Sequence, residues 1–256
     1  MPMKITAPPV LRFCALALFV ACADNSSSDR PDRDAPATDL QGRDSAAASA
    51  SAPASDVRGR DSAAAVRPRT ILFLGTSLSA GFGVGADSAF PALIQTLIDS
   101  AGLPFHVVNS GLSGETSAGG LRRLDWSLQQ PVHVLVLELG ANDGLRGLDP
   151  RELRENLDAI LTRTRDRYPD AALIIAGMEA PPNLGPRYTA DFRNVFTSLA
   201  DEHGAVLIPF LLEGVAGVPR LNQDDRIHPN SEGHRIIART VWAALERVLH
   251  NEAGGR

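Results

Sequence analysis

ILFLGTSLSAGFG, residues 71–83, sets Ser77 just behind a short apolar run, with glycines on both sides of it. A short run that is apolar on both faces is typical of a buried strand in a parallel sheet. Taken alone, a serine at the end of such a strand is expected to cap a helix. A phosphate-binding loop and a catalytic nucleophile are the two other interpretations of Ser77, and the segments after the other strands distinguish among the three.

Apolar runs and amphipathic segments alternate along the rest of the chain. They predict strands at 70–74, 104–108, 132–139, 171–176 and 205–208, and helices at 91–101, 121–128, 149–161, 190–202 and 230–249. The helix at 149–161 opens on Asp149, Pro150 and Glu152, which form a capping box with proline at the first helical position. This alternation predicts an α/β fold, a three-layer α/β/α sandwich around a parallel sheet of about five strands, in one domain over 70–250 followed by a tail, 251–256.

Residues 1–23 are typical of an export signal, because Lys4 and Arg12 precede the apolar stretch FCALALFVA at 13–21 and small residues follow it. Two processing routes remain open. Ala21-Cys22-Ala23 fits ordinary signal cleavage, whereas LFVAC at 18–22 resembles the lipobox of bacterial lipoproteins, in which Cys22 would carry the lipid. Both routes predict an exported protein, either periplasmic or an outer-membrane lipoprotein anchored to the membrane through Cys22.

Residues 24–69 are composed mainly of Ser, Ala, Asp, Arg and Pro, and GRDSAAA occurs twice, at 42–48 and 59–65. Such a composition buries too little apolar surface to offset the entropy of an ordered chain. The segment is therefore expected to be a disordered tether between the signal and the domain, with a partner-binding segment as the alternative.

The composition also excludes several classes of function. The formal net charge of -5 gives no electrostatic reason to bind nucleic acid. Lys4 is the only lysine, so no lysine is present downstream for a Schiff base or a phosphate loop. Both cysteines, Cys14 and Cys22, lie within the export signal, which leaves neither a disulfide nor a nucleophilic cysteine to the domain.

Polar residues follow the predicted strands at four places. Ser77 follows the first, a glycine-containing loop with Gly114 follows the second, Asn142 follows the third, and Asp225 and His228 lie three residues apart before the last helix. The carboxyl ends of parallel strands meet at one edge of a sheet, where ligands bind. An Asp and a His at this spacing can pair across a turn. These residues therefore offer a nucleophile, an oxyanion site and a base at one edge.

Five blocks of the sequence together resemble the SGNH (GDSL) hydrolase superfamily, and most closely its bacterial thioesterase, lysophospholipase and arylesterase subgroup. The blocks are SLSAG (77–81), SGETSAGGLRRL (113–124), ELGANDGLRG (138–147), PPNLGPRY (181–188) and QDDRIHPN (223–230). The resemblance covers nearly all of 70–249 and none of the tether. It implies the flavodoxin-like SGNH fold and a serine hydrolase that cleaves carboxylic esters or thioesters, with a small-molecule or lipid acyl ester as substrate.

The same resemblance implies a role for each site residue. Ser77 would attack the acyl carbonyl, His228 would act as general base and acid, and Asp225 would orient the imidazole. The oxyanion would be held by the backbone N–H groups of Ser77 and Gly114 and by the Asn142 side chain. No cofactor is implied, and no metal is expected, since no second cluster of ligands accompanies Asp224, Asp225 and His228.

One residue departs from the family pattern, which usually reads Gly-Asp-Ser where this chain has Thr76 before the serine. The threonine hydroxyl can still form a local hydrogen bond, but it supplies no negative charge, so a change in loop rigidity or pH response is expected. Glu138, Asp143 and Arg146, near the third block, are expected to form loop hydrogen bonds and to be solvated.

Apolar residues on the loops of the same edge are candidates to line an acyl groove, with ordinary loop packing as an equal alternative. They are Leu112, Leu145, Leu148, Pro182, Leu184 and Tyr188.

Three other functions remain open at this point. A carbohydrate O-deacetylase of the same superfamily is the main alternative, because a fold does not determine its substrate. A catalytically inactive surface binding protein is conceivable because of Thr76. A nucleotide-binding module is suggested by GFGVGA at 81–86, although these glycines begin several residues after the strand ends.

Overall fold

The five apolar runs form the central sheet of the protein. The computed structural model describes residues 68–254. Its strands are β1 (Arg69–Gly75), β2 (Phe105–Gly111), β3 (Val134–Glu138), β4 (Ala172–Ala176) and β5 (Val206–Ile208). All neighbouring strands run parallel, in the order β2-β1-β3-β4-β5. The predicted parallel sheet of about five strands is thus confirmed. The export signal at 1–23, Cys22 and the tether up to residue 67 lie outside the described residues and stay predictions, whereas Arg69, the predicted last residue of the tether, is the first residue of β1.

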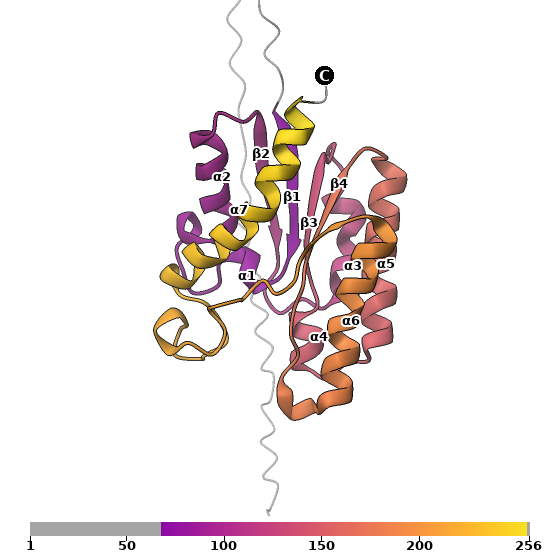
Figure 1. Ribbon diagram of the computed structural model, residues 1–256, viewed down its shortest axis with the longest axis vertical. Coiled ribbons are helices and arrows are strands. Elements are labelled where there is room, and N and C mark those ends of the chain that lie inside the picture. The colour runs from indigo at the N-terminus through magenta and orange to yellow at the C-terminus, as the bar shows by residue number, and fades with distance from the viewer. Residues whose placement is uncertain (1–67, 255–256) are drawn as a thin grey trace, which may run out of the picture. The chain divides into compact units, whose positions relative to one another are not determined.

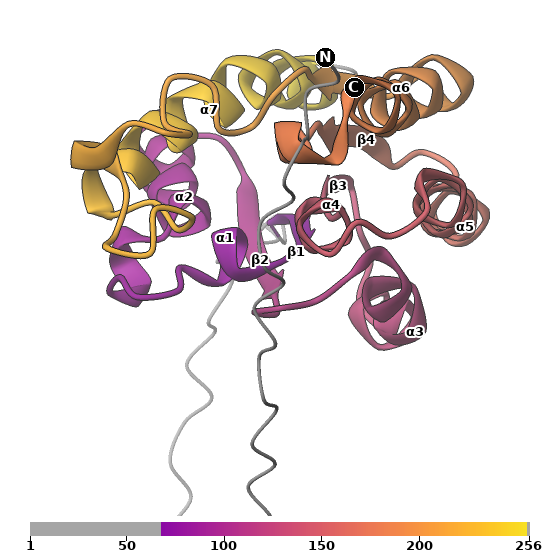
Figure 2. The ribbon, with the colours of Figure 1, turned by 90° about the horizontal axis from the view of Figure 1, so that it is seen from below.

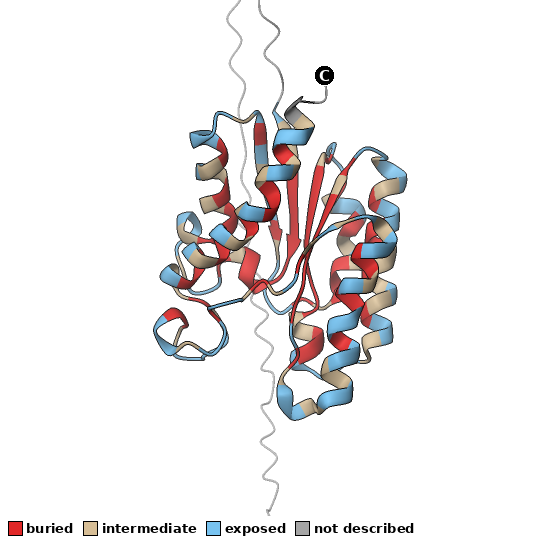
Figure 3. Ribbon diagram, in the orientation of Figure 1, coloured by how far each residue is buried: buried red, intermediate tan, exposed pale blue. Residues whose placement is uncertain are grey.

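The inner strands are apolar because helices cover both of their faces. All five residues of β3 are buried, and so are the last five of β1. Ile71 of β1 pairs with Val107 of β2 on one side and Val134 of β3 on the other. Residues on both faces of these strands therefore belong to the core, and the centre of the sheet is coloured as buried in Figure 3.

Helices lie in two layers, one on each side of the sheet (Figures 1 and 2). The packing of α2 against α7 forms one layer, and α3, α5 and α6 form the other. The long helices are α2 (Phe90–Ser100), α3 (Ser117–Ser127), α5 (Pro150–Arg167), α6 (Pro186–His203) and α7 (Ser231–Gly254). The short ones are α1 (Ser77–Ala80) and α4 (Ala141–Leu145), together with the 3₁₀ turns η1 (Ala86–Ser88), η2 (Pro182–Leu184) and η3 (Pro219–Leu221).

Several helices begin at capping residues, and apolar periodicity alone did not predict all of these boundaries. Asp149 caps α5 as predicted, since its carboxylate accepts from the backbone N–H of Arg151 at 2.9 Å. By contrast, α3 starts four residues before the predicted 121–128, because Thr116 caps it and Gly120 lets it approach the sheet. A Cβ on Gly120 would lie only 2.3 Å from Leu139 Cδ1. The last helix, α7, continues to Gly254 and so includes part of the predicted tail.

The two ends of the sheet differ: one opens into a crevice, and the other is closed by an ion pair. From β1 the chain passes to β2 on one side and afterwards to β3 on the other, so the loops that leave β1 and β3 diverge and open a crevice at the carboxyl ends of the strands. At the opposite end of the sheet, Arg69 at the start of β1 pairs with Glu252 near the end of α7, at 3.4 Å. Within 68–254, no helix is long and apolar enough to span a membrane.

A change in the core should weaken the fold much more than a change on the surface of the same helix. Leu157 of α5 is fully buried, whereas Glu155 is exposed. We expect Leu157→Ala to lower the free energy of unfolding by about 2–5 kcal/mol, because it removes buried contacts and leaves a cavity. Glu155→Ala should change it by less than about 0.5 kcal/mol. Urea unfolding followed by circular dichroism measures both, and equal effects would contradict the packing described here.

Candidate active site

A cleft of about 930 Å³ opens where the loops after the strands meet. Four of the five predicted catalytic and oxyanion residues line it together: Ser77, Gly114, Asn142 and His228. They come from the segments after β1, β2 and β3 and from the loop before α7. The structure therefore brings the predicted nucleophile, oxyanion donors and base to one place.

Ser77 is the first residue of α1 and is almost completely buried. Thr76, in extended conformation at φ -104°, caps this short helix, and its hydroxyl accepts from the backbone N–H of Leu78 at 3.4 Å. The carbonyl of Ser77 accepts from the N–H of Phe82 at 3.0 Å. The serine thus occupies a tight turn directly after β1, which limits the positions that its Oγ can reach.

The hydroxyl of Ser77 meets a histidine that is held by a carboxylate. His228 Nε2 lies 3.0 Å from Ser77 Oγ, and His228 Nδ1 lies 2.6 Å from Asp225 Oδ2. The other carboxylate oxygen of Asp225 accepts from the backbone N–H groups of Ile227 and His228, both at 2.9 Å. The bond to the imidazole, followed by these two backbone bonds, lowers the pKa of Asp225 from 3.8 to about 2.

The loop that carries Asp225 and His228 is fixed to the rest of the domain by a side-chain amide. Gln223 Nε2 donates to the carbonyls of Phe82 at 2.7 Å and Pro229 at 3.0 Å. Arg226 adopts φ +59°, the left-handed conformation, so the turn between the carboxylate and the imidazole is tight. The centroid of the Phe82 ring lies 4.5 Å from that of the His228 ring, so the two rings are in contact.

Two further segments place hydrogen-bond donors at the cleft. Gly114 has φ +78°, a conformation that favours glycine, and its carbonyl accepts from Arg146 Nη2 at 2.9 Å. Asn142, in α4, uses one amide N–H to donate to the carbonyl of Glu115 at 3.0 Å. A side-chain amide has two N–H bonds, so a second donor is left on Asn142, which lines the cleft.

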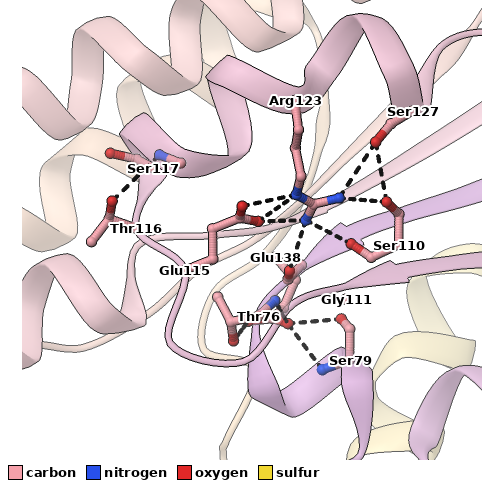
Figure 4. Close-up of polar contacts among 12 residues, drawn as sticks. Thr76, Ser79, Ser110, Gly111, Glu115, Thr116, Ser117, Arg123, Ser127 and Glu138 are labelled. Carbon is pink, nitrogen blue, oxygen red and sulfur yellow. Dashed lines mark hydrogen bonds and ion pairs between the residues drawn. The ribbon is translucent and has the colours of Figure 1, made fainter. Parts of the chain in front are cut away.

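Glu138, at the end of β3, was expected to be solvated but is completely buried behind α1. Its carboxyl group receives hydrogen bonds from the backbone N–H and hydroxyl groups of Thr76, both at 2.8 Å, and from those of Ser79 at 3.1 and 2.7 Å. Burial raises the pKa of Glu138, and the four hydrogen bonds oppose that rise. Figure 4 shows Glu138 beside the turn that carries Thr76 and Ser79.

Asp143 is also buried and joins α4 to the start of α3. Its two carboxylate oxygens accept from the Ser117 backbone N–H at 2.9 Å and from the Ser117 hydroxyl at 2.6 Å. Loop hydrogen bonds were expected for this residue, but the lack of solvent around it was not. The contact matters because it holds neighbouring Asn142 against the segment that follows Gly114.

The predicted acyl-groove residues divide into two sets. Leu145 and Pro182 line the cleft, whereas Leu112, Leu148, Leu184 and Tyr188 do not. Leu184 and Tyr188 pack against the core instead, and the Tyr188 hydroxyl donates to the Leu148 carbonyl at 2.6 Å. Apolar residues that the sequence analysis did not single out complete the lining, and they include Phe82, Met178, Phe210, Leu212 and Ile227. Met178, Phe210 and Leu212 follow β4 and β5 at positions that lie outside the five sequence blocks.

Neither the nucleotide-binding loop nor the metal site considered from the sequence is formed in residues 68–254. The GFGVGA stretch at 81–86 joins α1 to the short turn η1, so it does not open a helix after a strand as a dinucleotide loop does. In residues 68–254, no group of three or more His, Cys, Asp or Glu side chains is arranged to hold a metal ion.

Known proteins of similar sequence indicate the family of this chain. The chain is 38% identical over 182 residues to Esterase TesA of Pseudomonas aeruginosa, covering 71% of this chain and 90% of that protein. It is equally similar to Thioesterase 1/protease 1/lysophospholipase L1 of Escherichia coli K12, at 38% over 186 residues, covering 72% and 86%. The Arylesterase of Vibrio mimicus is 38% identical over 181 residues, covering 70% and 88%.

Solved structures of similar esterases share the fold of this chain, which confirms the predicted fold. The crystal structure of TesA superimposes with a TM-score of 0.67 at 38% identity, covering 70% of this chain and 99% of that one. The psychrotrophic esterase EstA from Pseudoalteromonas sp., inhibited by monoethylphosphonate, gives a TM-score of 0.67 at 35% identity, covering 72% and 100%. Residues 73–236 match the GDSL-like Lipase/Acylhydrolase family. The chain therefore belongs to this family of ester-cleaving hydrolases, as its sequence blocks predicted.

Proposed function

We propose that the protein hydrolyses carboxylic esters and thioesters by transferring the acyl group to Ser77. The observation that supports this proposal most directly is the continuous chain of contacts from Ser77 Oγ to His228 Nε2, at 3.0 Å, and from His228 Nδ1 to Asp225, at 2.6 Å. A hydroxyl, an imidazole and a carboxylate in this order are the elements of a serine nucleophile activated by a base.

In the first half of the reaction, Ser77 Oγ attacks the carbonyl carbon while His228 Nε2 takes the hydroxyl proton. Asp225, kept ionised by its low pKa, stabilises the resulting imidazolium and holds the ring in the required tautomer. The tetrahedral intermediate then collapses, and His228 gives the proton to the departing alcohol or thiol. In the second half, a water molecule loses its proton to His228 and attacks the acyl-serine, which releases the acid and restores Ser77.

Negative charge develops on the carbonyl oxygen in both halves. The donors proposed to stabilise it are the backbone N–H groups of Ser77 and Gly114 and the free N–H of the Asn142 amide. Donors that are already in place cost no reorganisation when the charge appears, so each is worth about 100- to 1000-fold in kcat. The bond from Asn142 to the Glu115 carbonyl prepares this arrangement before substrate binds.

The threonine in place of the usual aspartate keeps the nucleophile turn intact. Its hydroxyl and backbone N–H both bind Glu138, so the residue anchors the turn without adding a second carboxyl group beside a buried one. This arrangement favours an active enzyme over the inactive binding protein that Thr76 made conceivable.

The lining of the cleft favours an acyl chain as the bound group. Phe82, Leu145, Met178, Phe210 and Ile227 present apolar surface beside Ser77, which suits a hydrocarbon chain better than a carbohydrate. Relatives named esterase, arylesterase, thioesterase and lysophospholipase support the same substrate class. A small-molecule or lipid acyl ester is therefore the proposed substrate.

The place of action follows from the sequence of residues 1–23. We propose that the protein is exported, and that Cys22 serves as its lipid anchor if the lipobox is used. An exported enzyme meets esters and lipids outside the cytoplasm and does not meet cytosolic acyl-CoA.

Removal of the nucleophile should abolish the activity without unfolding the protein. We expect Ser77→Ala to lower kcat for p-nitrophenyl hexanoate by at least about 1000-fold, with an unchanged circular dichroism spectrum. The control is Ser100→Ala. Ser100 is exposed at the end of α2 and does not line the cleft, so this variant should keep full activity. A fully active Ser77→Ala protein would eliminate the proposed function.

The apolar cleft predicts a rise in kcat/KM with acyl length. Each additional buried methylene contributes about 0.8 kcal/mol, or roughly a factor of four, until the cleft is filled. A series of p-nitrophenyl esters from acetate to octanoate measures this slope. Leu145→Ser, at the cleft wall, should flatten it, whereas Leu112→Ser, exposed but outside the cleft, should leave it unchanged. Highest kcat/KM on the acetate would favour the carbohydrate deacetylase instead.

The buried carboxyl of Glu138 predicts a specific dependence of stability on pH. Because its pKa is raised above 4.5 in the folded chain, the folded state holds this proton more tightly than the unfolded state does. The stability that results is complete below pH 4.5 and is lost as the pH rises through the raised pKa. The free energy of unfolding of the unchanged protein, relative to that of Glu138→Gln, should therefore fall as the pH rises above 4.5. Urea unfolding at several pH values tests this, and a constant or growing difference would contradict it.

A further inference from the structure

Arg123 of α3 contacts three segments that lead to the proposed oxyanion donors, although it does not line the cleft itself. Its Nε donates to both carboxylate oxygens of Glu115, at 2.8 and 2.7 Å. Its Nη2 donates to the carbonyls of Ser110 at 2.8 Å and Gly75 at 3.2 Å, while Nη1 donates to the Ser110 hydroxyl at 2.5 Å. Figure 4 shows the guanidinium at the centre of these contacts.

The contact with Gly75 connects Arg123 to the nucleophile. Gly75 is the last residue of β1 and lies two positions before Ser77. Its carbonyl also accepts from the backbone N–H of Leu112, at 3.0 Å, which is the residue that leads into the Gly114 loop. One carbonyl therefore ties the β1 end, the β2 end and α3 together.

The contact with Glu115 connects Arg123 to the other two donors. Glu115 directly follows Gly114, so a fixed Glu115 side chain restrains the backbone that carries the Gly114 N–H. Its carbonyl accepts the bond from Asn142 Nδ2, at 3.0 Å. Displacement of Glu115 would therefore move the Asn142 amide as well as the Gly114 backbone.

Burial makes these contacts hard to replace. The Glu115 side chain is 5% exposed and that of Arg123 is 19% exposed, so neither group regains full hydration if the other is removed. The planar guanidinium also satisfies a carboxylate and two carbonyls simultaneously. A lysine ammonium carries the same charge but cannot reproduce this fork of donors.

We propose that Arg123 is a positioning residue for the reaction: through Glu115 and Gly75 it sets the spacing among the Ser77, Gly114 and Asn142 donors. This inference rests on the proposed ester hydrolysis. Interactions that strengthen only as charge develops raise kcat and leave ground-state binding nearly unchanged. The effect of Arg123 should therefore appear in kcat and not in KM.

The test compares two adjacent arginines on one helix in the full-length protein. Arg123→Lys should lower kcat for p-nitrophenyl hexanoate by about 10- to 100-fold, with KM within about threefold, because small displacements of catalytic groups cost about that much. Arg122→Lys is the matched control, since Arg122 is exposed, and it should keep kcat within about twofold. Circular dichroism and Tm establish that both variants are folded.

Glu115→Gln provides a second variant that leaves the bonds from Arg123 to Gly75 and Ser110 in place. We expect a smaller loss of kcat, about 3- to 10-fold, because the amide keeps one acceptor oxygen toward the guanidinium. If both residues act through one contact, the double variant should lose little more than Arg123→Lys alone. Losses that multiply independently would overturn the proposal.

Each remaining outcome also decides the question. A folded Arg123→Lys protein with kcat within twofold of the unchanged protein, or with a change confined to KM, would overturn the inference while leaving the proposed function intact. If Arg123→Lys does not fold, the same criteria apply to Glu115→Gln. Absence of hydrolysis by the unchanged protein would instead reject the proposed function, and this inference with it.

Discussion

The hydrogen bond between Ser77 and His228 joins residues that are 151 positions apart in the chain, and most of the site serves to keep that contact at 3.0 Å. On one side, Glu138 holds the turn after β1, because its carboxyl group accepts hydrogen bonds from the Thr76 backbone N–H and the Ser79 hydroxyl. On the other, Gln223 and Asp225 hold the loop before α7. The two halves meet only because β1 lies inside the sheet, next to the crevice that the strand order creates.

Much of the fold could be predicted because buried parallel strands leave a simple trace in the sequence. The runs that became β1 and β3 are apolar on both faces, and no alternation of polar residues obscures them. The short helices α1 and α4 were not predicted as such, since four or five residues are too few to show a helical period. The early start of α3 depends on Thr116 as a cap and on the close approach of Gly120 to Leu139, which only the tertiary packing reveals.

The candidate site divides in a similar way. Ser77, Gly114, Asn142, Asp225 and His228 could be predicted because each lies in a motif, and strands of one direction bring such motifs to one edge. Nothing in the sequence separates Leu145, which lines the cleft, from Leu112, which does not, since both were expected on loops of that edge. Burial of Glu138 was equally hidden, because a glutamate at the end of an apolar run is expected to reach water. Its position depends on donors from Thr76 and Ser79, some 60 residues earlier in the chain.

The ion pair between Arg69 and Glu252 brings the beginning of β1 and the end of α7 together at the pole of the sheet opposite the cleft. Seven residues of β1 separate that pole from the turn of Ser77, a span of roughly 23 Å at about 3.3 Å for each residue. A solid support or a fused reporter attached beside either of these residues would therefore leave the mouth of the cleft open to bulky esters. The two neighbouring ends also make the domain suitable for circular permutation, in which a short linker joins them and new termini are cut elsewhere.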